Sequence, residues 1–223
     1  MGRKGPGVFA FLTPKKPKPT LLALGDSIIS DCYPGVNRGA ASLVYRNLDN
    51  DFPEFEGQDL SQAEFINTSR TGFRLVDVET AFKALPAAAR FNWAILSVGG
   101  NDLLAGELEP QSFEARYGTF VKNLRARCAH LAILNAYDPT QGTGLVASSV
   151  ARGKPPRLDL IEFLTGLNAI IARQAGPDLV DVHGHFMRHP EWFQRDIEPT
   201  GRGASEIRRL ILRKFRPESE KTP

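Results

Sequence analysis

Five short apolar runs, each followed by a segment with helical spacing of its apolar residues, constrain the fold of this chain most strongly. The runs cover residues 20–25, 64–68, 93–98, 131–134 and 179–182, and the helical segments cover residues 39–49, 74–85, 112–127, 158–173 and 203–215. Strands that alternate with helices in this way are typical of a parallel sheet covered by helices on both faces. The pattern therefore predicts a single α/β domain.

The two ends of the chain and one internal stretch differ in composition from the predicted domain. Residues 1–19 are rich in proline, lysine and glycine, which favours a flexible basic arm because proline removes backbone hydrogen-bond donors. We place the α/β domain at residues 20–216 and a disordered tail at residues 217–223. The stretch at about 139–156 is long for a loop in a compact domain, so we expect it to form a lid or rim.

Composition excludes several classes of protein. The formal net charge is +3 and the basic residues are spread along the chain, so no nucleic-acid partner is expected. No segment approaches the roughly 18 apolar residues of a membrane span, and the run at 8–12 is short for a signal peptide. Cys32 and Cys128 imply no disulfide framework. These observations predict a cytoplasmic protein with a small-molecule ligand.

Polar residues and glycines follow the predicted strands where each strand ends. Right-handed crossovers place the carboxyl ends of parallel strands along one edge of the sheet, where ligands bind in open α/β folds. Four loops meet there: 25–27, 69–72, 99–102 and 183–200. We therefore expect the functional site at this edge.

The residue types in these loops suit acyl transfer. A serine becomes a good nucleophile when a base takes its proton, and the reaction also needs donors aimed at the developing oxyanion. Ser27 supplies a hydroxyl and a backbone N–H, Gly72 supplies a second N–H without a side chain, and the amide of Asn101 supplies a third donor. These are the groups that an ester hydrolase requires.

The same residues also have structural interpretations. Ser27 alone fits a turn after a strand, and Asp26 and Asp102 are expected to accept hydrogen bonds from loop amides. His183, His185 and His189 lie close in sequence but lack the spacing and partners of a metal site, so no metal or cofactor is expected.

Two further expectations concern helices. Ser112 has the residue type and position of an N-cap, because a serine hydroxyl accepts hydrogen bonds from the first helical N–H groups. The arginines of the last helix, Arg208, Arg209 and Arg213, are expected to form a solvated face.

Three of the four loops resemble a known family. Leu24-Gly25-Asp26-Ser27, the loop at Gly72 and Val98-Gly99-Gly100-Asn101-Asp102 resemble the first three blocks of the SGNH, or GDSL-type, hydrolases, over about residues 20–215. The resemblance implies a flavodoxin-like three-layer α/β/α sandwich with a five-stranded parallel sheet. It also implies Ser27 as nucleophile, an oxyanion hole of Ser27, Gly72 and Asn101, and no metal.

The fourth block departs from the family pattern. The family usually has Asp, two residues and His-Pro, followed by a glycine that opens the last helix. With Pro199 and Gly203 setting the register, Glu198 takes the place of the histidine, Arg195 that of the aspartate, and Asp196 lies one position away. A carboxylate with its ordinary pKa of about 4.3 is poorly matched to a serine hydroxyl, so burial would have to raise that pKa.

The proton-handling part of the site therefore has three interpretations. In the first, a histidine reaches Ser27 and Asp196 or Glu198 orients it; His183 is preferred because it follows the last strand. In the second, Glu198 or Asp196 acts directly on Ser27. In the third, the site binds an ester or acetylated ligand without turning it over.

The predicted function is a serine esterase that cleaves a carboxylic ester, a thioester or an acetylated sugar through a Ser27 acyl-enzyme. The alternatives are a hydrolase with a non-standard base and a catalytically silent binding protein of the same fold. A nucleotide or phosphate binder is a further alternative, which the carboxylate of Asp26 disfavours because it would repel the anion.

Overall fold

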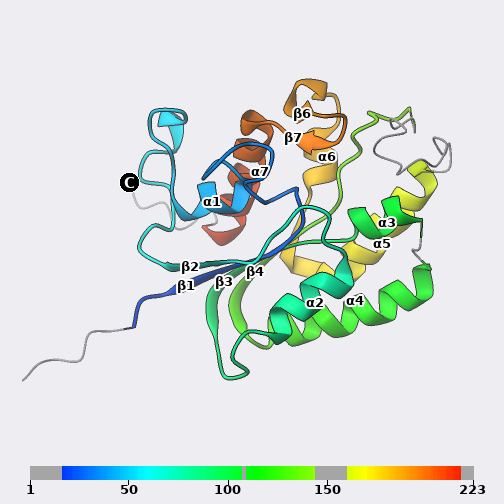
Figure 1. The fold of residues 1–223 in the computed structure, drawn as a ribbon, viewed down its shortest axis with the longest axis horizontal. Coiled ribbons are helices and arrows are strands. Elements are labelled where there is room, and N and C mark those ends of the chain that lie inside the picture. The colour runs from blue at the N-terminus through cyan, green and yellow to red at the C-terminus, as the bar shows by residue number, and fades with distance from the viewer. Residues whose placement is uncertain (1–16, 107–108, 144–159, 217–223) are drawn as a thin grey trace, which may run out of the picture.

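The computed structural model describes residues 17–106, 109–143 and 160–216. Most of the predicted arm at 1–19, most of the predicted lid at 139–156 and the predicted tail at 217–223 lie outside the described residues. Within them, five strands form a parallel sheet in the order β2-β1-β3-β4-β5, with helices on both faces (Figure 1). The predicted five-stranded α/β architecture is therefore confirmed.

The strands are short and their side chains alternate between the two faces of the sheet. They are β1 Thr20–Gly25, β2 Glu64–Asn67, β3 Phe91–Ser97, β4 Cys128–Leu134 and β5 Leu179–Val180. In β1, Leu21 and Ala23 pack into one hydrophobic cluster and Leu22 and Leu24 pack into the other. This alternation follows from the two-residue period of a strand and explains why β1 is apolar throughout.

Helices cover both faces of the sheet. Residues of α1 Ala40–Tyr45, α6 Val182–Phe186 and α7 Gly201–Phe215 pack into one cluster, and residues of α2 Leu75–Lys83, α4 Pro110–Arg125 and α5 Leu160–Ala175 pack into the other. The remaining elements are α3 Gly100–Ala105, the 3₁₀ turns Pro53–Phe55, Gly176–Asp178 and Pro190–Trp192, and the hairpin of β6 Phe193–Gln194 and β7 Glu198–Pro199. Across the described ranges, no helix has both the length and the apolarity needed to cross a membrane.

Several predicted boundaries were wrong for local reasons. The first helix ends at Tyr45 because the backbone of Arg46 is extended. The predicted cap at Ser112 was also wrong: Glu109 accepts hydrogen bonds from the N–H groups of Gln111 and Ser112, and the helix begins two residues before Ser112. The last strand ends at Val180, since Asp181 caps the short helix α6.

The strand order places the ends of β1 and β3 side by side at a topological switch point. From β1 the chain passes to β2 on one side and then returns to β3 on the other. Open α/β sheets bind ligands in the crevice at such a point. Ser27 follows β1 and Asn101 follows β3, so the fold itself brings these two residues to the same crevice.

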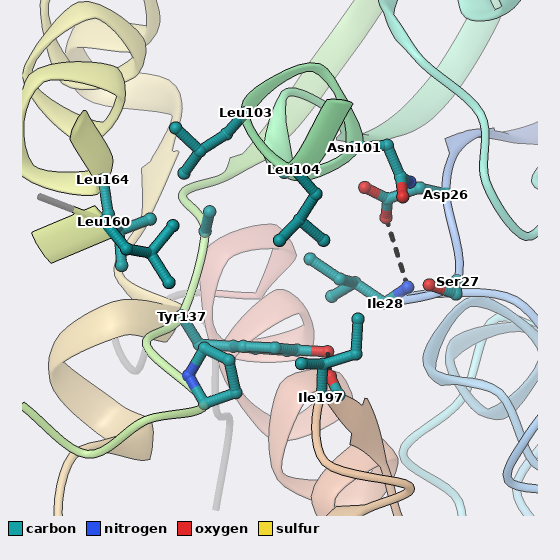
Figure 2. A pocket seen from close by; sticks show the side chains of 13 residues that line it. Asp26, Ser27, Ile28, Asn101, Leu103, Leu104, Tyr137, Leu160, Leu164 and Ile197 are labelled. Atoms are coloured by element: carbon teal, nitrogen blue, oxygen red, sulfur yellow. Dashed lines mark hydrogen bonds between the residues drawn. The ribbon is translucent and has the colours of Figure 1, made fainter. Parts of the chain in front are cut away.

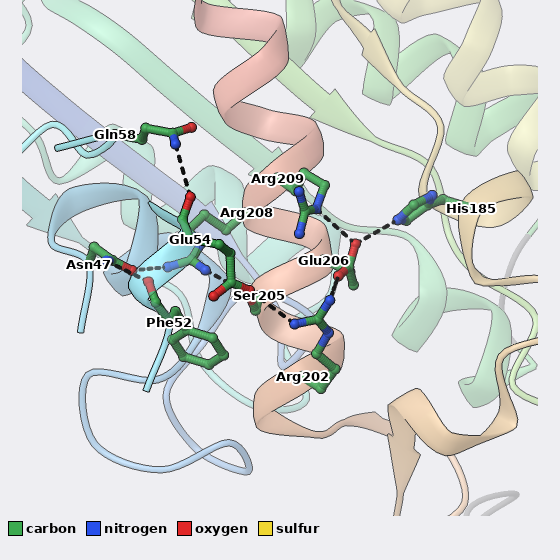
Figure 3. Close-up of polar contacts among 10 residues, drawn as sticks. All are labelled: Asn47, Phe52, Glu54, Gln58, His185, Arg202, Ser205, Glu206, Arg208 and Arg209. Atoms are coloured by element: carbon green, nitrogen blue, oxygen red, sulfur yellow. Dashed lines mark hydrogen bonds and ion pairs between the residues drawn. The ribbon is translucent and has the colours of Figure 1, made fainter. Parts of the chain in front are cut away.

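Arg208 corrects the expectation of a solvated arginine face on the last helix. Its side chain is fully buried, and its guanidinium lies 3.6 Å from the ring centroid of Phe55. It donates hydrogen bonds to Asn47 Oδ1 at 2.5 Å and Ser205 Oγ at 2.6 Å (Figure 3). Burial lowers the pKa of Arg208 to about 10. Arg209 is half-buried beside Glu206, while Arg213 is exposed as predicted.

We expect Arg208→Ala to lower the free energy of unfolding by about 3 kcal/mol, because it leaves a cavity and strands the buried partners of the guanidinium. Arg213→Ala, on the exposed face of the same helix, should change it by less than about 0.5 kcal/mol. Urea denaturation followed by circular dichroism measures both values. Equal, small effects of the two substitutions would contradict the structural role of Arg208.

Candidate active site

Ser27 lies at the carboxyl end of β1 in a closely packed turn. A Cβ atom at Gly25 would lie 2.4 Å from the carbonyl oxygen of Ser97, so only glycine fits this approach of β1 to β3. The N–H of Asp26 donates to that carbonyl oxygen at 3.1 Å. The Ser97 hydroxyl donates to Asp26 Oδ1 at 3.0 Å, as does the N–H of Ile28 at 3.1 Å. Asp26 therefore organises the turn that holds Ser27, in agreement with its predicted structural role.

The loop at Gly72 is tied to the residues that follow β3. The Asn101 amide donates to the carbonyl oxygen of Phe73 at 3.1 Å, and the N–H of Leu75 donates to Asp102 Oδ2 at 3.1 Å. The φ angle of Gly72 is +78°, in the region that favours glycine. Because an amide side chain has two N–H bonds, Asn101 retains a second donor. These contacts hold the Gly72 loop beside Asn101.

A pocket opens beside Ser27 and extends away from the sheet edge (Figure 2). Asp26, Ser27 and Asn101 lie at one end of it, and Leu103, Leu160 and Leu164 lie at the other. The remaining wall comes from these residues: Ile28, Gly100, Leu104, Ala136, Tyr137, Pro139 and Ile197. Ser27 and Asn101 thus share one pocket, whereas Gly72, His183, Asp196 and Glu198 do not line it.

Glu198 is the carboxylate that contacts Ser27. It lies on β7 with only 6% of its surface exposed. Burial raises the pKa of Glu198, while hydrogen bonding from the hydroxyls of Ser27 and Tyr33 and the charge of Arg195 lower it in part. Its Oε2 atom is buried and has no hydrogen-bond partner in the part of the chain that the structure describes. A glutamate needs a raised pKa to act as the base for a serine hydroxyl, and burial raises the pKa of Glu198 in this way.

A second buried carboxyl, that of Asp26, lies near Glu198. Burial, with a smaller contribution from the negative charge of Glu198, raises the pKa of Asp26 to about 7, although hydrogen bonds from Ser97 and Ile28 lower it in part. Burial and both carboxylates also raise the pKa of Tyr137. Because each ionised carboxylate disfavours the ionisation of the other, this part of the site holds a proton more readily than either side chain would in water.

A strained turn carries Glu198 to Ser27. Arg195 and Asp196 have φ angles of +47° and +71°, which non-glycine residues rarely adopt. The N–H of Ile197 closes the turn on the carbonyl oxygen of Arg195 at 2.9 Å. The buried Tyr137 hydroxyl donates to the carbonyl oxygen of Ile197 at 2.7 Å. Strain of this kind persists where surrounding contacts enforce it, and it is common at functional sites.

The histidines have other partners. His183 lies on α6, with Nδ1 3.2 Å from the carbonyl oxygen of Ala136. His185 pairs with Glu206 at 3.2 Å, and His189 stacks on Trp192 with ring centroids 3.7 Å apart. Asp196 is exposed at the turn. The structure thus brings Ser27 and Asn101 together and places Glu198 against Ser27, while it gives His183 and Asp196 no contact with Ser27.

Two tyrosines near the base lie outside the residues that sequence reasoning assigned to the chemistry. Tyr137 follows β4 at the functional edge of the sheet, and this position is a signal for a site residue. Tyr33 lies in a loop where nothing in the local sequence indicates its contact with Glu198. Its ring also lies under the guanidinium of Arg195, 5.6 Å from the ring centroid.

Comparisons with known proteins agree with this geometry. A model of the GDSL-like lipase/acylhydrolase family matches residues 23–205, while no curated protein sequence matches significantly. The structure resembles LAE5, an α/β hydrolase from the metagenome of Lake Arreo in Spain, with 19% identity, a TM-score of 0.64, and coverage of 87% of this chain and 93% of that one.

Two further solved structures share the fold. Axe2, an acetylxylan esterase from Geobacillus stearothermophilus, has 16% identity and a TM-score of 0.63, over 92% of this chain and 97% of its own. TesA has 20% identity and a TM-score of 0.59, over 89% of this chain and 98% of its own. One Axe2 structure is of a catalytic mutant in which alanine replaces a serine. At these identities the likeness establishes the fold.

Proposed function

We propose a serine esterase reaction at Ser27 for this chain, which belongs to the GDSL-like lipase/acylhydrolase family. Membership of the family makes the chain an acyl hydrolase of the α/β fold. The observation that carries the assignment of residues is the burial of the Glu198 carboxyl beside Ser27, whose hydroxyl partly offsets the rise that burial causes in its pKa. We propose Ser27 as the nucleophile and Glu198 as its base.

In the first step, Ser27 Oγ attacks the ester carbonyl carbon while its proton passes to the Glu198 carboxylate. The N–H groups of Ser27 and Gly72 and the Asn101 amide are the donors for the resulting oxyanion. The bond from carbon to the leaving oxygen then breaks, and Glu198 returns the proton to that oxygen. Ser27 is left as an acyl ester.

In the second step, water releases the acyl group. Glu198 takes a proton from the water as its oxygen attacks the acyl carbon, and the same donors stabilise the second oxyanion. When the bond to Ser27 Oγ breaks, Glu198 returns the proton to Oγ. The products are an alcohol or thiol from the first step and a carboxylic acid from the second.

The raised pKa makes Glu198 suited to this work. A carboxylate in water is a weak base toward a serine hydroxyl, because the pKa of the carboxyl is far below that of the hydroxyl. Burial raises the carboxyl pKa and so narrows this difference. The buried, unpartnered Oε2 atom of Glu198 gives the transferred proton a second acceptor site.

A catalytically silent binding protein is the second candidate. It is favoured by Glu198 at the place where the family usually has histidine. Carboxylic esters, thioesters and acetylated sugars remain the proposed ligand classes, and Axe2 acts on an acetylated xylan. Because Cys32 and Cys128 are both free, we propose a reducing, cytoplasmic compartment.

The function is tested by hydrolysis and by labelling. We expect the purified chain to release p-nitrophenol from p-nitrophenyl butyrate, and a fluorophosphonate probe to form a covalent adduct. Mass spectrometry of the digested protein should place that adduct on the peptide containing Ser27. If the chain hydrolyses no ester or thioester of a panel and forms no adduct with the probe, the silent binding protein is favoured.

A further inference from the structure

The pocket beside Ser27 is polar at one end and apolar at the other (Figure 2). We call the apolar end the leucine arm: Leu103 and Leu104 of α3 with Leu160 and Leu164 of α5. Leu164 is 5% exposed and belongs to the hydrophobic core, while Leu103 and Leu160 are half-buried. The arm begins where the polar residues around Ser27 end.

Two polar side chains of the pocket, those of Asp26 and Tyr137, are already engaged within the protein. Asp26 Oδ1 accepts from Ser97 and Ile28, and the Tyr137 hydroxyl donates to the carbonyl oxygen of Ile197. The aromatic ring of Tyr137 therefore presents an apolar face between the two ends of the pocket. Among the described lining residues, those of the leucine arm have no polar side-chain atoms to pair with the hydroxyls of a sugar, and burying such hydroxyls unpaired is costly.

We propose that the leucine arm holds the acyl chain of the substrate, so that the enzyme prefers medium-chain acyl esters to acetyl esters. This inference rests on the proposed function, because it takes Ser27 as the attacking group. Each methylene group that enters the arm leaves water, which favours the bound transition state about threefold to fourfold per group. The ester carbonyl lies at the polar end and the hydrocarbon extends toward Leu164.

The acyl chain is the part of the substrate that stays in place during turnover. It remains attached to Ser27 through both steps, whereas the leaving group must depart before water enters. An apolar wall therefore helps both steps when it contacts the acyl chain. If the apolar wall instead bound the alcohol part of the ester, it would slow the departure of the alcohol from the site.

The test is a chain-length profile of the full-length enzyme. We expect kcat/KM for p-nitrophenyl esters to rise from acetate through butyrate to octanoate. Leu164→Trp fills the far end of the arm and should lower the ratio of octanoate to acetate activity at least about tenfold. Leu103→Trp makes the same change at a half-buried position and keeps the test decisive if Leu164→Trp does not fold.

Ile161→Trp is the matched control, since Ile161 lies on the same helix, is 37% exposed and does not line the pocket. It should leave the octanoate-to-acetate ratio unchanged. A profile that peaks at acetate, or a ratio that neither leucine variant changes, would overturn the proposal. A rise with chain length in alkyl acetates instead of acyl esters would overturn the assignment to the acyl chain.

Failure of the proposed function gives a different result. If the wild-type enzyme hydrolyses no ester of any length, the esterase assignment fails. The leucine arm is then tested with sodium octanoate and sodium acetate by calorimetry. Octanoate should bind more tightly than acetate, and Leu103→Trp should remove the difference; equal binding of the two carboxylates would reject the arm as well.

Discussion

Ser27→Ala is expected to lower kcat/KM for p-nitrophenyl butyrate by at least about 10³-fold, because it removes the atom that forms the acyl-enzyme. The backbone N–H of residue 27 and the other oxyanion donors remain in this variant, so binding of an ester should persist. Steady-state kinetics and fluorophosphonate labelling of the variant measure the two consequences of the substitution. Labelling should be lost together with hydrolysis.

Ser30→Ala provides the matched control for this substitution. Ser30 is a buried serine only three residues from Ser27, with 4% of its surface exposed, and it does not line the pocket. The control variant should keep its activity and its label. Hydrolysis that survives Ser27→Ala would remove Ser27 from the role of nucleophile.

Glu198→Gln is expected to lower kcat/KM by about 10²- to 10⁴-fold, the usual contribution of a general base. Glutamine keeps the shape and volume of the side chain but cannot accept the serine proton. Because the carboxyl is buried and tightly placed, the isosteric change leaves the surrounding turn with the same packing. Kinetics at several pH values, with thermal unfolding as the control for folding, measure the effect.

The pH profile provides a second test of Glu198. The base must be ionised to act, so wild-type kcat/KM should fall as the pH is lowered through the raised pKa of Glu198. Asp26 titrates with a pKa of about 7 and contributes a charge to the same region. Asp26→Asn removes this titration but keeps an acceptor for Ser97 and Ile28, so an acid limb that persists in the variant belongs to Glu198.

A histidine base predicts the opposite pattern. If His183 were the base, Glu198→Gln would retain an acid limb, and His183→Gln would abolish activity. With Glu198 as the base, His183→Gln should keep most of the activity. In the structure the ring of His183 lies against the carbonyl oxygen of Ala136, so its loss affects a backbone contact.

Local sequence patterns predicted those candidate site residues that lie close to the end of a strand. Ser27, Gly72 and Asn101 each follow a strand, and parallel strands bring such residues to one edge. Asp26 and Asp102 accept backbone hydrogen bonds as their positions suggested. The sheet order then placed β1 beside β3 and put Ser27 and Asn101 in one pocket.

The burial of Arg208 and the choice of Glu198 among the candidate bases lay beyond such reasoning for the same physical cause. An arginine on an amphipathic helix suggests a solvated face, and only the packing of residues 47–55 against α7 buries the guanidinium of Arg208. A glutamate in a loop suggests a solvated carboxylate with an ordinary pKa. Only the folded hairpin, strained at Arg195 and Asp196, buries Glu198 against Ser27 and Tyr33.

The sequence by itself thus determined the parallel α/β fold, and it predicted the edge of the sheet that carries the candidate site, the serine and the candidate oxyanion donors. Periodicity and turn chemistry are local, so they can be recognised from neighbouring residues. The tertiary structure decided which carboxyl meets Ser27, how far its pKa rises, and where the leucine arm lies. Those properties depend on burial and on distances between segments far apart in the chain, such as Ser27 and Glu198, which come together only when the core packs.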